Sequence, residues 1–169
     1  MSASAVEFSR RILASKIGAV PFRQEIAANE AERAALARRF DLVSLGRLTA
    51  AVELSRKGRD TILLRATFAA EFEQTCVVSL EPVAGAVAEE FAIRYGPPDE
   101  EGGADDVAAE DTFEPLTDDS IDIGEAVAQQ FSLALPPFPR DPGAVIETEP
   151  ESEPGEGAFA ALARLRGRG

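Results

Sequence analysis

The feature that most constrains this sequence is a long alternation of apolar and polar residues before and after residue 60. In the run that follows Thr61, one parity is apolar and the other is polar or small, which is the pattern of a strand with one buried face. A second alternating run, from Leu48 to Leu54, precedes it across the polar turn at 57–60. Two such runs joined by a glycine-containing turn predict an antiparallel hairpin. The apolar parity of the longer run holds Ile62, Leu64, Ala66, Phe68, Ala70 and Phe72.

A third alternating run continues this pattern between Val83 and Tyr95, after Pro82. Gly85 and Glu89 interrupt its apolar parity and predict a bulge or bend nearby, while Gly46 predicts either a bulge or the true start of the first strand. We therefore expect an α+β fold in one domain. Its centre is a curved antiparallel sheet, open or barrel-like, and it carries two main helices and a flexible acidic loop.

Two helices are expected from their N-terminal capping signals. Asn29 with Glu32 has the form of a capping box and predicts a helix from Glu30 to Arg39. The apolar face of this helix is thin and made of alanines, so we expect it on the outside of the molecule. Asp122 followed by Glu125 predicts a second, amphipathic helix over 122–135 that covers the sheet.

The ends of the chain are less regular than its middle. A modest alternation over residues 6–13 predicts an opening strand at an edge of the sheet. Residues 96–119 are acidic and read as an exposed loop, and residues 146–169 are rich in Glu, Pro and Gly before a basic end. We therefore place the domain at 1–145 and a flexible tail with a short terminal helix at 146–169.

Charge divides this sequence into two halves of opposite sign. Residues 1–70 carry 12 basic and 7 acidic side chains, whereas residues 71–157 carry 2 basic and 23 acidic ones, within a net charge of −13. A basic half can contact phosphate, and an acidic stretch can hold a basic protein. The candidate RNA contacts are Arg10, Arg11, Arg38, Arg39, Arg56, Lys57 and Arg59. The candidate protein-binding acids are Asp99, Glu100, Glu101, Asp105 and Asp106.

The composition argues against most enzymatic and metal chemistry. The 169 residues include no His and one Cys, so the usual general base and the usual zinc ligands are missing. No phosphate-binding or nucleophile motif and no calcium-loop order appears. We expect no catalytic residues, no cofactor, no metal and no small-molecule substrate. Cys76 lies among acidic residues, which should disfavour a thiolate.

The same composition bears on compartment. A lone cysteine cannot form an internal disulfide, so the fold does not need an oxidising compartment. There is no leader-like apolar run and no stretch of 18 apolar residues. We expect a cytoplasmic protein that does not engage membranes.

Two elements of the sequence, the second in two parts, carry a resemblance to a known family. Thr75 to Pro82 (TCVVSLEP) resembles the C-x-x-C-L-x-P element of the YceD family, and the segments 121–125 (IDIGE) and 133–139 (LALPPFP) resemble its D-L/I-x-E…L-x-L-P-x-x-P element. The likeness covers roughly residues 6–145. Ser79 stands where the family has its second cysteine, which argues against a metal or redox role for that pair.

The resemblance implies a process and not a mechanism. Members of the family are linked to accumulation of large-subunit (23S) ribosomal RNA in bacteria and plastids. The expected function is thus a non-enzymatic ribosome-biogenesis factor whose partner is the large-subunit precursor or its RNA. The alternative is an acidic adaptor or chaperone for a basic ribosomal protein. Cys76 is then a marker of the family and not an active site.

Overall fold

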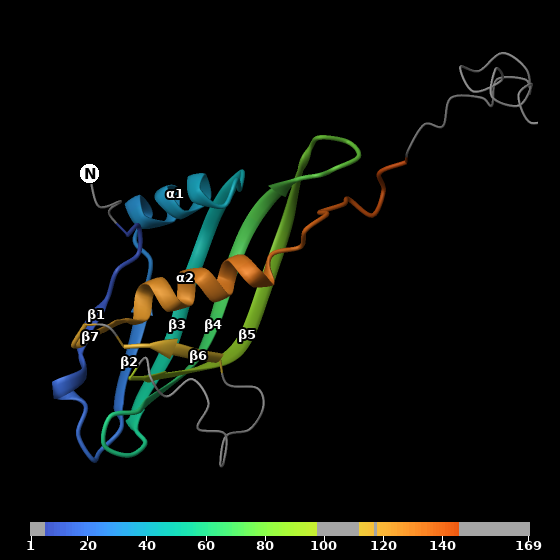
Figure 1. Ribbon diagram of the computed structural model, residues 1–169. Coiled ribbons are helices and arrows are strands. Elements are labelled where there is room, and N and C mark those ends of the chain that lie inside the picture. Colours follow the sequence, from blue (N-terminus) through green and yellow to red (C-terminus); the bar gives the residue numbers. More distant parts are fainter. Residues whose placement is uncertain (1–5, 98–111, 117, 146–169) are drawn as a thin grey trace, which may run out of the picture.

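The computed structural model describes residues 6–97, 112–116 and 118–145. A strongly curved sheet dominates it, and its strands lie in the order β2-β3-β4-β5-β6; a separate two-stranded sheet pairs β1 with β7 (Figure 1). The elements in chain order are β1 (Arg11–Leu13), η1 (Ala14–Lys16), β2 (Phe22–Ala27), α1 (Glu30–Arg39), β3 (Ser44–Arg56), β4 (Ile62–Thr75), β5 (Pro82–Gly96), β6 (Thr112–Pro115), β7 (Ser120–Asp122) and α2 (Ile123–Ala134).

The expected hairpin is the centre of the sheet. β3 pairs antiparallel with β4, and β4 pairs antiparallel with β5 over its whole length, from Ile62 opposite Tyr95 to Thr75 opposite Pro82. The apolar parity of β4 is buried as predicted. Strands β2 and β6 form the two edges of an open sheet, so the fold is α+β with a curved sheet and not a closed barrel.

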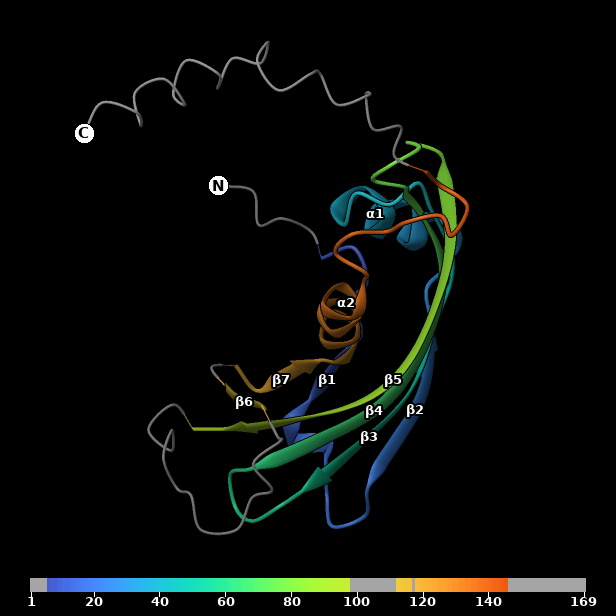
Figure 2. The ribbon, with the colours of Figure 1, turned by 90° about the vertical axis from the view of Figure 1, so that its right-hand side faces the viewer.

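Both helices lie on the concave side of the sheet (Figure 2). Phe131 on α2 is fully buried and makes edge-on contacts with Phe68 and Phe72 of β4 and with Phe40 at the end of α1. Such aromatic pairs add stabilisation beyond their buried area. One hydrophobic core thus joins α1, α2 and the inner face of the sheet.

The prediction that α1 lies outside the core is wrong. Leu36 is fully buried and Ala37 nearly so, whereas Ala31 and Ala34 are exposed. Alanine side chains are too small to decide which face of a helix is buried. The one large apolar residue, Leu36, decides it, and Phe40 one turn later packs against the same core.

The N-terminal strand does not join the main sheet. β1 is three residues long and pairs with β7, with Arg11 opposite Asp122. The edge position next to β3 belongs instead to β2. This strand was not predicted, because Gly18 and Pro21 just before it indicate an interruption of regular structure. β6 and β7 were also not predicted, since each is too short to show an alternation. β6 is the one strand of the main sheet that runs parallel to its neighbour.

The two glycines singled out in the sheet behave differently. The register between β3 and β4 shifts between Leu45 and Arg47, which confirms a bulge at Gly46. No such shift occurs at Gly85, which excludes the bulge and leaves the bend as the alternative predicted there. A Cβ on Gly85 would lie 2.6 Å from the Phe72 ring. This glycine therefore makes room for a cross-strand aromatic ring and does not distort the ladder.

Both capping signals are confirmed. The Asn29 side chain accepts from the Glu32 amide while Glu32 accepts from the Asn29 amide, and Asp122 accepts from the amides of Gly124 and Glu125. Within the described residues, no helix has the length and apolar character needed to span a membrane. The predicted tail, apart from its boundary at Val145, lies outside the described residues.

Candidate nucleic-acid interface

The structure separates the seven predicted RNA contacts instead of gathering them into one patch. Arg38 precedes the start of β3, whereas Arg56, Lys57 and Arg59 lie at or beyond its end. The 13 residues of β3 correspond to roughly 40 Å of strand. The two groups therefore occupy opposite ends of the sheet.

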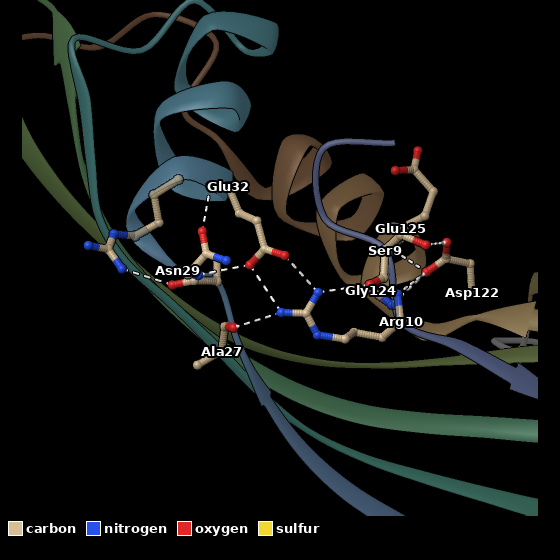
Figure 3. Close-up of polar contacts among 10 residues, drawn as sticks. Ser9, Arg10, Ala27, Asn29, Glu32, Asp122, Gly124 and Glu125 are labelled. Carbon is tan, nitrogen blue, oxygen red and sulfur yellow. Dashed lines mark hydrogen bonds and ion pairs between the residues drawn. The ribbon is translucent and has the colours of Figure 1, made fainter. Parts of the chain in front are cut away.

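Arg10 is one of two predicted contacts whose side chains form ion pairs with carboxylates of the described residues. Its guanidinium forms a two-pronged ion pair with Glu32, with Nη1–Oε1 at 2.7 Å and Nη2–Oε2 at 3.0 Å (Figure 3). It also donates to the Ser9 and Ala27 carbonyl oxygens. Hydrogen bonding to Arg10 lowers the pKa of Glu32, and the same contact raises the pKa of Arg10. The charge of Arg10 is thus matched by a partner on α1.

Arg39 is engaged in the same way. It forms ion pairs with Glu125 at 2.7 Å and with Glu7 at 3.0 Å, and hydrogen bonding to Glu125 raises the pKa of Arg39. The pKa of Glu7 is lowered first by a hydrogen bond from the backbone amide of Glu7 and then by Arg39. Arg39 therefore ties the end of α1 to the start of α2 and to the N-terminal segment.

Asp122 completes this arrangement, which we call the polar latch (Ser9, Arg10, Glu32, Arg39, Asp122 and Glu125, with Glu7). The Asp122 carboxylate caps α2 and also accepts from the Arg10 amide at 2.7 Å and from the Ser9 hydroxyl. Figure 3 shows Glu32 of α1, Asp122 and Glu125 at the start of α2, and Ser9 and Arg10 of the N-terminal segment lying close together. Arg10 and Arg39 are held in ion pairs that stabilise the fold, so a phosphate would have to compete with carboxylates for them.

Arg56 organises a second cluster of cations at the other end of the sheet. Its Nε donates to the Ile17 carbonyl at 2.9 Å, Nη2 to Ala14 at 2.8 Å and Nη1 to Arg59 at 2.9 Å. These bonds hold η1 beside the β3–β4 turn, at the lower edge of Figure 1. All three acceptors are neutral carbonyl oxygens, and among the described residues no carboxylate pairs with Arg56. Within the described residues, its positive charge is therefore met by carbonyl dipoles and not by an ion pair.

Three further cations surround Arg56. Lys57 and Arg59 are exposed in the turn, and Lys16 is exposed on η1. No ion pair engages any of the three within the part of the chain that the structure describes. We call this cluster of Lys16, Arg56, Lys57 and Arg59 the cationic end; Asp60 is the one acid in the turn. The sequence does not place Lys16 beside the turn; the Arg56 hydrogen bonds to Ala14 and Ile17 bring η1 there.

The remaining predicted residues lie apart from the cationic end or outside the described structure. Arg11 is exposed on β1, which leads into η1, and Arg38 is exposed on α1. β5 also ends near the β3–β4 turn, where Ile62 faces Tyr95. The chain therefore enters the predicted acidic loop at this end. The candidate protein-binding acids are outside the described residues and stay a prediction: Asp99, Glu100, Glu101, Asp105 and Asp106.

Cys76 overturns the expectation that its surroundings disfavour a thiolate. The amides of Asp141, Ser79 and Val78 each donate to its Sγ at 3.4 Å. These hydrogen bonds, that of Asp141 first and then those of Ser79, lower the pKa of Cys76 to about 6. Amide dipoles aimed at the sulfur outweigh carboxylates that lie farther away in solvent. The hydrogen bond from Asp141 to Cys76 also holds the β4–β5 turn against the segment that follows α2.

Comparison with known proteins adds one finding to this geometry. A family model described as large ribosomal RNA subunit accumulation protein YceD matches residues 64–166, which is more than half of the chain. No curated protein and no solved structure gives a significant match. The match includes both segments on which the resemblance was based.

Proposed function

Because this chain belongs to the YceD family, we propose that it supports accumulation of large-subunit (23S) ribosomal RNA by binding the precursor RNA through the cationic end. The partner would be the RNA backbone in the large-subunit precursor. This is a contact of the kind that positions a protein on RNA without reading its sequence.

The observation that carries the proposal is the contrast in how the cations are used. Arg10 and Arg39 are neutralised by carboxylates, whereas Lys16, Lys57 and Arg59 are exposed around Arg56. Arg56 donates its hydrogen bonds to the backbone carbonyls of Ala14, Ile17 and Arg59, and so holds together the two segments that carry the other three cations. Cations that meet no carboxylate of the described residues favour phosphate binding, since none of the described ion pairs has to be broken and counterions are released.

We propose further that the protein acts by binding and not by catalysis. The carboxylates whose pKa is lowered, Glu7 and Glu32, are held in ion pairs with arginines of the latch. That use is structural: it fixes the position of α1 and the N-terminal segment. A compartment in which ribosomes are assembled, the cytoplasm of a bacterium, fits this role.

The test is RNA binding by the full chain with a matched pair of double variants. Lys57→Glu/Arg59→Glu changes the cationic end, and Arg38→Glu/Arg140→Glu changes net charge equally at exposed positions elsewhere. An in vitro transcript of the large-subunit precursor serves as the probe. Removing two phosphate contacts should lower the slope of log K against log salt by about 1.4, at roughly 0.7 per contact for single strands.

The control separates a local contact from a general effect of charge. The Arg38/Arg140 variant should keep most of the wild-type slope, because its cations lie outside the cationic end. Equal loss in both variants would contradict the assignment. Unchanged RNA binding in both, together with capture of a basic ribosomal protein, would favour the acidic adaptor instead.

A further inference from the structure

The corner around Cys76 carries an unusual number of exposed apolar side chains. Val77 and Leu80 in the β4–β5 turn are 52% and 75% exposed, and Phe138 after α2 is 78% exposed. Leu133 near the end of α2 and Val145 are exposed to a similar degree. Apolar groups gathered on one part of a surface mark a contact site more often than isolated ones do. We call Val77, Leu80, Leu133 and Phe138 the apolar corner.

This corner is built from two segments that are tied together. The Val77 amide donates to the Pro139 carbonyl at 2.9 Å, the Gln74 side chain donates to Pro136 at 3.1 Å, and the Asp141 amide donates to Cys76. Figure 1 shows the chain after α2 passing beside the β4–β5 turn. The apolar side chains are therefore presented from a fixed framework.

The backbone conformation of Leu80 also supports a contact site at this corner. Its φ is 62°, in the left-handed region that a leucine avoids. The Leu80 amide donates to the Cys76 carbonyl, which holds the turn in this shape. A large apolar residue is thus kept in a costly conformation with its side chain in solvent, which suits a contact made by that side chain.

We propose that the apolar corner is the docking site for the end of this same chain, residues 158–169. Those residues hold Phe159, Leu162 and Leu165 at spacings of three, a pattern that puts apolar side chains on one side of a helical turn. They also contain three arginines and no acid. A short helix of this kind is marginal alone and gains its stability by docking.

Charge and reach both favour this occupant. The segments that form the corner carry Glu73, Glu81 and Asp141 against one cation, Arg140, so they complement an arginine-rich peptide. The described chain ends at Val145, and residues 146–157 intervene. Twelve residues span at most about 40 Å, which is enough to turn back. A short tether gives an effective concentration near the millimolar range, so a weak contact suffices.

The experiment is hydrogen exchange, followed by mass spectrometry, on the full chain. Amides of 158–166 should exchange about 10-fold more slowly than in an unstructured peptide, as expected for roughly 1 mM effective concentration and a ~0.1 mM intrinsic dissociation constant. Leu80→Ser/Phe138→Ser should abolish this protection. The matched control is Val20→Ser/Val43→Ser, which removes two exposed valines elsewhere and should leave the protection intact.

A second measurement keeps the proposal open to contradiction if the corner variant unfolds. In a Cys76→Ala background, which removes the competing thiol of the same turn, Leu80→Cys/Leu162→Cys should form an intramolecular disulfide under mild oxidation faster than Val20→Cys/Leu162→Cys does. Equal rates, or unprotected tail amides in the wild type, would overturn the proposal. Protection that depends on protein concentration would assign the corner to the tail of a second copy and overturn it equally.

Discussion

The polar latch and the cationic end use the same type of side chain in opposite ways. In the latch, Arg10 and Arg39 each meet a carboxylate within 3 Å and are about one-third exposed. At the cationic end, Arg56 meets only backbone carbonyls, and Lys57 and Arg59 meet solvent. The number of arginines in a stretch therefore says little about the charge available to a ligand. What decides it is whether the fold brings a carboxylate to the same place.

The largest effect should follow from breaking the latch. Arg10→Ala leaves Glu32 partly buried without its partner, so we expect a loss of about 2–3 kcal/mol in the free energy of unfolding. Urea denaturation measures it. Arg11→Ala is the matched control, because Arg11 is the adjacent, exposed arginine, and it should cost less than about 0.5 kcal/mol. Equal losses would remove the distinction between the two uses of arginine.

Gly124 tests how closely the N-terminal segment is held in the latch. A Cβ at this position would lie 2.5 Å from the Phe8 carbonyl oxygen and 3.1 Å from the Arg10 amide nitrogen. Gly124→Ala should therefore destabilise the fold by about 1–3 kcal/mol, as overpacking does. Gly18→Ala, where nothing lies within 4 Å, serves as the control. A stabilised Gly124→Ala protein, as alanine's helix propensity alone would give, would show that the segment moves freely.

Cys76 extends the comparison to a negative charge that is stabilised by backbone amides and the Ser79 side chain and not by a cation. Its pKa is about 6 in the folded protein against an ordinary value of 9.0. A lowered pKa stabilises the fold fully above pH 9, and this contribution is lost as the pH falls through 6. Between these values, unfolding should take up a proton at the thiolate. Cys76→Ala should flatten the rise of stability with pH over that window, as measured by denaturant titrations at several pH values. An unchanged slope would mean that the thiol stays protonated.

The smallest effect on stability should come from the cationic end. Lys57→Glu/Arg59→Glu alters two exposed residues without ion pairs, so the free energy of unfolding should change by less than about 0.5 kcal/mol. Thermal or urea unfolding checks this beside the RNA measurement. A loss of unfolding free energy as large as that of Arg10→Ala would show that these residues stabilise the fold, and it would weaken their assignment to RNA binding.

Prediction from the sequence succeeded for strands and helix starts that depend on residues adjacent in the chain. The alternation of β3, β4 and β5 and the capping residues Asn29 and Asp122 are local signals, and each is confirmed. It failed where a partner far along the chain decides: β1 pairs with a strand more than 100 residues away, and β1, η1 and β2 lie between Arg10 and Glu32 in the sequence. Short strands and side-chain pairs of this kind leave no periodic trace.

The sequence by itself determined the three central strands, the helix starts and the family, because periodicity, caps and short motifs are written in neighbouring residues. Only the tertiary structure decided which cations are free. Two arginines one residue apart, Arg10 and Arg11, are indistinguishable as letters, yet one is held in an ion pair and the other faces solvent. The physical reason is that an ion pair depends on a distance, and distances between remote residues exist only once the chain has folded.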